Sequence, residues 1–148
     1  MFKKDETKAT GKLIVEIKDK KGNVKETREL ENLVVDTGLA YIADRMEDNS
    51  IPTAMSHMAI GTGTSAAASG NTALGTEAAR VALTSSTVTS NAIAYVCSFA
   101  AGTGTGAITE AGILNAGSSG TLLCRTVFSV VNKGASDSMT ITWTVTIS

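Results

Sequence analysis

The chain has 148 residues and a formal net charge of −1, which fits one domain with a sizeable core and gives no overall attraction to a polyanion. One proline and 4% aromatic residues argue against a proline-rich linker and against a stacking platform for single-stranded nucleic acid. There is no apolar run of about 18 residues, as a membrane span needs, and the start, MFKKDETKATGK, lacks the apolar segment of a secretory signal. We therefore expect neither a nucleic-acid partner nor a membrane.

Residues 11–30, GKLIVEIKDKKGNVKETREL, have the pattern of a β-hairpin. Apolar residues alternate with mostly charged ones in the first strand, and residues 19–23 supply a turn. The second strand is charged at most positions, which is typical of an exposed or edge strand. We expect residues 1–35 to form a charged N-terminal arm and hairpin that docks on a partner, with the candidate contact residues Lys12, Ile14, Glu16, Lys18, Lys25 and Arg28.

Residues 31–48, ENLVVDTGLAYIADRMED, change from a strand period to a helix period. The spacing i, i+3, i+4 and i+7 predicts a short α-helix near residues 38–47, with one apolar face that contains Leu39, Ile42, Ala43 and Met46. Asp36 or Thr37 can cap its N-terminus. We expect no other helix.

From residue 55 onward the pattern predicts strands separated by turns rich in Gly and Ser. The last strand is the clearest, because Met139, Ile141, Trp143, Val145 and Ile147 alternate with threonines. Short strands with one helix predict a mainly β protein. We expect residues 36–148 to form an antiparallel β-sandwich, jelly-roll-like, preceded by the N-terminal hairpin.

The glycines of residues 59–77, AIGTGTSAAASGNTALGTE, resemble a nucleotide-binding loop only superficially. A P-loop needs a lysine after its glycines, and a dinucleotide-binding loop must open a helix whose N-terminus holds the pyrophosphate. This stretch has neither feature, and residues 102–106 fail in the same way. We interpret both as neutral connecting loops and expect no cofactor.

The sequence gives no catalytic or metal-binding constellation. His57 is the only histidine, and no G-x-S-x-G motif surrounds a serine. Glu77 and Glu110 are better explained as ion-pair partners of an arginine, Arg80 or Arg125, than as a glycosidase-like carboxylate pair. We expect that the protein is not an enzyme.

The two cysteines and the aromatic residues fit structural positions. Cys97 and Cys124 match no zinc-type spacing, so we expect buried thiols rather than a disulfide or a reactive site, and a reducing compartment during folding. Tyr41, Tyr95 and Trp143 all fall in apolar phases, which favours core packing over an exposed sugar-binding surface.

Charge is distributed unevenly along the chain. Residues 1–50 hold ten Lys/Arg and eleven Asp/Glu, which leaves six charged residues for the other 98. A free soluble domain normally carries more surface charge than this. Either the surface is neutral and hydroxyl-rich, or much of it is covered by other protein chains. The six residues are Glu77, Arg80, Glu110, Arg125, Lys133 and Asp137.

Five segments in order, NLVVDTGLAYIADRM, MSHMAIGTGT, NTALGTEAARVALTS, ITEAGILNAGSSGTLLCRTVFS and DSMTITWTVTIS, make residues 32–148 resemble small virion proteins of tailed bacteriophages. Such proteins are labelled tail-fibre or tail-collar-fibre proteins, or capsid decoration proteins. The resemblance implies no catalytic residues. It implies a location in the virion after synthesis in the host cytoplasm, and a role in assembly.

We therefore expect a capsid decoration (cement) protein, with a trimer favoured, that binds the major capsid protein through its charged N-terminal segment. The first alternative is a tail-fibre or tail-adaptor protein that docks on tail proteins by the same hairpin. The second is a carbohydrate-binding module, which needs an exposed aromatic surface.

Overall fold

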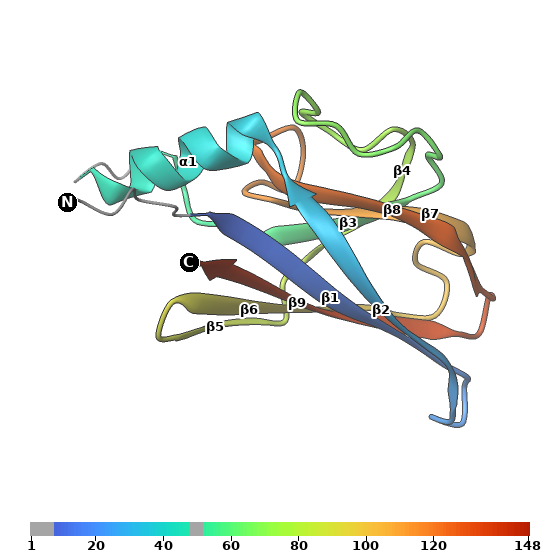
Figure 1. Cartoon of the computed structure of the whole chain (residues 1–148). Coiled ribbons are helices and arrows are strands. Elements are labelled where there is room, and N and C mark those ends of the chain that lie inside the picture. The colour runs from blue at the N-terminus through green and yellow to red at the C-terminus, as the bar shows by residue number, and fades with distance from the viewer. Residues whose placement is uncertain (1–7, 48–51) are drawn as a thin grey trace.

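A computed structural model describes residues 8–47 and 52–148, and it is mainly β with one α-helix (Figure 1). The expected fold class is confirmed at this level. The elements in chain order are β1 Ala9–Lys18, β2 Val24–Val34, α1 Asp36–Met46, β3 His57–Gly61, β4 Glu77–Ala82, β5 Ser85–Thr89, β6 Ala92–Phe99, β7 Gly106–Leu114, β8 Leu122–Lys133 and β9 Ser138–Ile147.

The nine strands form one antiparallel sheet in the order β4-β3-β7-β8-β2-β1-β9-β6-β5, curled into a half-barrel. We call β4, β3, β7 and β8 the β7 half, and β2, β1, β9, β6 and β5 the β9 half. Strand β2 joins the halves, because its last residues, Leu33 and Val34, pair with β8. The expected jelly-roll sandwich is not confirmed, since all nine strands belong to a single sheet.

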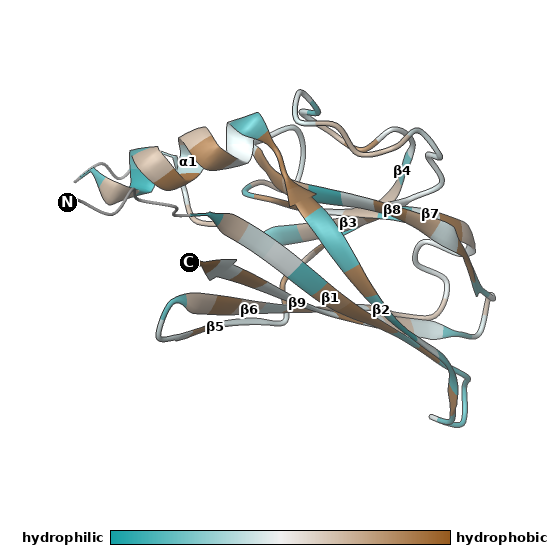
Figure 2. Cartoon of the chain, in the orientation of Figure 1, coloured by the Kyte–Doolittle hydropathy of each residue, from teal (hydrophilic) through white to brown (hydrophobic). Residues whose placement is uncertain are grey.

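The core lies on the concave side of the sheet. Alternate residues of β1 and β9 point inward and are almost fully buried, as the period-2 pattern predicts for strands with one covered face. Figure 2 shows hydrophobic residues where β2 approaches α1 and hydrophilic residues next to them along the strand. Residues with at most 2% exposure include Leu13, Val15, Ile17, Met58, Ile60, Cys97, Phe99, Ile113, Cys124, Ile141, Trp143 and Val145.

The N-terminal hairpin is built into the middle of the sheet. Strand β1 pairs with β2 on one side and with β9 on the other, from Ala9 to Lys18. Strand β2 pairs with β1 along most of its length but with β8 at only two residues, so most of its other edge is free. The expected boundary at residue 35 therefore does not separate a free docking arm from the β-domain.

Helix α1 confirms the predicted helix, but the predicted apolar face was only partly right. Gly38 and Tyr41 are its buried residues, whereas Leu39 is 48% and Met46 83% exposed. Gly38 explains the difference, because a Cβ at this position would lie 2.0 Å from the carbonyl oxygen of Leu123. This backbone contact turns the Gly38 side of the helix toward β8 and leaves the Leu39 side outward.

The start of α1 also differs from the prediction. Val35 is the N-cap residue, and no side chain caps the helix. Thr37, one of the two expected caps, instead donates its hydroxyl to the carbonyl oxygen of Leu122 at 2.9 Å. The hydroxyl therefore ties the helix to β8. No helix in the described ranges is long and apolar enough to cross a membrane.

Candidate interaction face

The convex surface of the β9 half is the candidate site. The inward alternation of β1 places Lys12, Ile14, Glu16 and Lys18 on this convex side, together with the threonines of β9. The strongest contacts of β1 and β9 are with their sheet neighbours, and α1 packs mainly on β8. We call this convex side the outer face, formed by Thr10, Lys12, Ile14, Glu16, Lys18, Thr27, Glu29, Glu31, Ser85, Thr87, Thr89, Ala92, Ala94, Val96, Ser98, Thr140, Thr142, Thr144 and Thr146.

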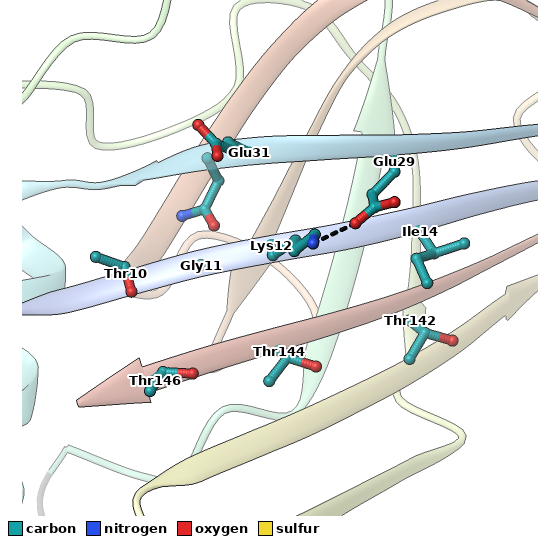
Figure 3. Close-up of a pocket in the computed structure, with 10 residues that line it drawn as sticks. Thr10, Gly11, Lys12, Ile14, Glu29, Glu31, Thr142, Thr144 and Thr146 are labelled. Atoms are coloured by element: carbon teal, nitrogen blue, oxygen red, sulfur yellow. Dashed lines mark ion pairs between the residues drawn. The ribbon is translucent and has the colours of Figure 1, made fainter. Parts of the chain in front are cut away.

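A shallow groove of about 730 Å³ crosses the outer face over β2, β1 and β9 (Figure 3). Lys12 and Glu29 form an ion pair at its centre, and Ile14, 45% exposed, lies beside them. The hydrogen bond and the charge of Glu29 raise the pKa of Lys12. The threonines of β9 form the other wall, so the groove offers hydroxyls, an ion pair and one exposed aliphatic side chain.

The outer face is divided into a charged and a neutral part. On the β1 and β2 side lie Lys12, Glu16 and Glu29, with Lys18 3.4 Å from Glu16. On the β6 and β5 side all outward residues are Ala, Val, Ser or Thr, so this part has hydroxyl and methyl groups only. The row of threonines on β9 marks the boundary between the two parts.

Two of the six predicted contact residues are not on this face. Arg28 pairs with Val15, on the concave side, and donates to the carbonyl oxygens of Ser129 at 2.6 Å and Val130 at 2.8 Å. It bridges β2 to β8 where the backbone pairing of these strands has ended. Lys25 forms an ion pair with the buried carboxylate of Asp137 at 2.9 Å. Both cations serve the fold, and the other four predicted residues lie together on β1.

The glycine-rich loop between β3 and β4 encloses a buried carboxylate. Glu110 of β7 is fully buried and accepts backbone N–H bonds from Gly63, Gly75 and Thr76, each at 2.7 Å. A Cβ on Gly63 would lie 2.3 Å from Oε2 of Glu110, so the loop approaches this closely only with glycine there. The amides that a phosphate-binding loop would offer to a ligand are occupied by the chain's own anion.

Arg125 of β8 completes this internal site. Its Nε and Nη2 atoms donate to Oε1 of Glu110 at 3.1 and 3.0 Å, and its other donors reach Ser65 and Asn71 in the loop. Burial raises the pKa of Glu110, but the amide hydrogen bonds and Arg125 outweigh it and hold the pKa below its ordinary value. The loop therefore covers the convex side of the β7 half, fixed by a charged pair.

The remaining charges after residue 51 are also used internally. Glu77 pairs with Arg80 at 2.6 Å, as expected from the sequence. Lys133 is 1% exposed and donates to two carbonyl oxygens, at 2.9 and 2.8 Å. Burial lowers its pKa. All six charged residues therefore have partners within the chain, and the surface from β3 to β9 has almost no free charge.

Catalytic and sugar-binding groups are not assembled in the described part of the chain. His57 Nδ1 lies 2.8 Å from the hydroxyl of the adjacent Ser56, and no carboxylate hydrogen-bonds to it there. In the same residues no three His, Cys, Asp or Glu side chains lie close enough to hold a metal ion. The described aromatic residues are at most 9% exposed, which confirms the predicted burial of Tyr41, Tyr95 and Trp143.

Cys97 and Cys124 are confirmed as free, buried thiols. Burial raises the pKa of Cys97 to about 11 and that of Cys124 well above its ordinary value. Both thiols are therefore protonated at neutral pH and poorly nucleophilic.

Comparison of the chain with known proteins finds no matching family model, no matching curated protein and no matching solved structure.

Proposed function

We propose that this protein is a non-enzymatic structural protein of a bacteriophage virion, a capsid decoration protein that binds the outer shell as a symmetric oligomer and stabilises it. The resemblance of residues 32–148 to small virion proteins of tailed bacteriophages suggests that the protein belongs to a virion. The observation that supports a role in assembly is the division of the outer face into a charged part and a neutral part. A protein that works by assembly needs such surfaces, and it needs no catalytic groups.

The charged part of the outer face is the proposed contact with the shell. It combines Lys12, Glu16, Lys18 and Glu29 with the exposed side chain of Ile14. Mixed charges around an aliphatic residue give orientation and register to a protein contact, and the aliphatic residue adds buried area. The neutral part and the remaining surface are then available for copies of the same chain.

Point substitutions test this docking contact. Deleting residues 1–30 is uninformative, because it removes β1 and most of β2 from the middle of the sheet. We expect that Lys12→Glu and Ile14→Asp leave folding intact but abolish binding to particles that lack the protein. Ser118→Glu, in the exposed turn between β7 and β8, is the matched control and should bind like wild type. Wild-type binding by both face variants would contradict the proposed contact.

The alternative is a tail-fibre or tail-adaptor protein, which differs in location and copy number. Quantitative mass spectrometry of purified virions separates the two. A copy number comparable with that of the major capsid protein supports decoration, and a handful of copies supports the tail. Absence from virions would refute both. The burial of the described aromatic residues argues against the carbohydrate-binding alternative.

A further inference from the structure

Strand β5 ends the sheet and has an unprotected outer edge. It pairs with β6 from Ser85 to Thr89 in a regular register without a bulge. All five residues are exposed, and no hydrogen bond within the described residues reaches the other edge of the strand. An edge strand of this kind presents alternate backbone N–H and C=O groups to any extended chain that approaches.

The other free edges of the sheet carry charges or covering side chains, which sets β5 apart. The long free edge of β2 carries Lys25, Glu26 and Arg28, and Arg28 bridges it to β8. At the end of β4, the thiol of Cys97 lies against the carbonyl oxygens of Val81 and Ala82. Strand β5, with the sequence SSTVT, has neither a charge nor a proline nor a covering side chain.

We infer that β5 is the contact between two copies of this chain, joined edge to edge about a two-fold axis. The charge distribution argues for a second copy, because no residue from 81 to 109 is charged. In a two-fold contact each residue meets residues of the same strand, which is unfavourable for like charges and acceptable for a neutral strand. A neutral edge also offers no charge pattern that would select a different protein.

The register of this contact follows from the sequence of β5. Antiparallel pairing of all five residues puts the two-fold axis at Thr87, so that Thr87 faces Thr87 and Ser86 faces Val88 of the second copy. Val88, 69% exposed in the single chain, then gains a cross-strand neighbour. The sheet continues from one copy into the other, and the neutral parts of the two outer faces become one surface flanked by the charged parts.

Disulfide trapping of the purified protein tests this register without any virion. Directly opposed residues of an antiparallel pair have Cβ atoms roughly 4.5–5.5 Å apart, close enough for a disulfide after small adjustments. We expect Thr87→Cys to form covalent dimers on mild oxidation, whereas Ser85→Cys alone and Thr89→Cys alone form few. A mixture of the last two should form heterodimers. The native thiols are buried and do not compete.

Sedimentation supplies the second measurement. A ladder of five residue pairs is short, so we expect a wild-type dimer that dissociates on dilution and not the trimer expected from the resemblance. Thr87→Lys should raise the dissociation constant at least tenfold, and the control Thr27→Lys, exposed on β2, should not. A wild-type protein that stays monomeric at millimolar concentration, or equal cross-linking by all three single cysteine variants, would overturn the inference.

Discussion

The buried Glu110–Arg125 pair makes a quantitative prediction about stability. Glu110→Gln keeps the shape of the side chain but removes its charge, and its new N–H₂ group faces backbone N–H donors or Arg125. Both partners are at most 2% exposed, so the guanidinium is left buried without its counter-charge. Removing one partner of a buried ion pair costs about 3–5 kcal/mol. For a chain of this length, this corresponds to a decrease in melting temperature of about 10–16 °C.

Equilibrium unfolding in urea, followed by circular dichroism, measures this loss. We expect Arg125→Met to cost less than Glu110→Gln, because three backbone amides still hold the carboxylate. The double variant should be more stable than Glu110→Gln alone, since it has no unpaired buried charge. Glu77→Gln, which alters the partly exposed pair with Arg80, should cost less than about 1 kcal/mol.

Hydrogen exchange locates the effect in the glycine-rich loop. The amides of Gly63, Gly75 and Thr76 should be protected in wild type and lose protection selectively in Glu110→Gln. Two outcomes would refute the role of the pair in holding the loop. One is a Glu110→Gln variant whose free energy of unfolding is within about 1 kcal/mol of wild type, below the cost expected for an unpaired buried charge. The other is additive effects of the two single substitutions.

Three further predictions concern the pH dependence of Glu110, the buried thiols and the Arg28 bridge. The folded pKa of Glu110 is lowered, so its contribution to stability should be complete above its unfolded pKa of about 4.3. This contribution should be lost as the pH falls below that value. A pH series of urea unfolding checks this, and a Glu110→Gln variant with the same acid dependence would contradict it. Cys97 and Cys124 should react with Ellman's reagent only after unfolding, and rapid reaction of either thiol in the native protein would show that it is accessible. Arg28→Ala should cost about 1–2 kcal/mol, because it removes charged hydrogen bonds to two β8 carbonyls, whereas Lys12→Ala should leave the urea midpoint unchanged; equal effects of the two would show that the bridge is not needed.

Strand positions could be predicted from the sequence because one face of each strand is buried. The period-2 alternation in β1 and β9 directly reflects core packing, and the structure confirms it. The path of the sheet could not be predicted, because charges along β2 indicate exposure but not which strand lies beside it. The helix face was misjudged for a similar reason. The contact of Gly38 with Leu123 is made by the backbone, and side-chain hydropathy carries no signal for it.

At the candidate site, the β1 residues could be grouped from the sequence because they alternate along one strand. Arg28 and Lys25 could not be separated from them, since their partners on β8 and at Asp137 are about a hundred residues away. The glycine-rich loop gave a partial signal. The absence of lysine argued against a phosphate-binding loop, and Glu110 was assigned to an arginine, but nothing in the local pattern joined that carboxylate to the loop amides.

The internal use of charge has a consequence for crowded assemblies. Like charges on neighbouring copies repel over about 8 Å at physiological ionic strength, and a symmetric lattice repeats each such contact many times. In this chain the charges after residue 51 are paired internally, where Glu110 and Arg125 hold a loop and Asp137 receives Lys25. They therefore contribute to the fold without adding repulsion between copies. The charged part of the outer face, on β1 and β2, stays exposed and can bind a partner of different composition. This arrangement suits the close packing of identical copies that the proposed β5 contact requires.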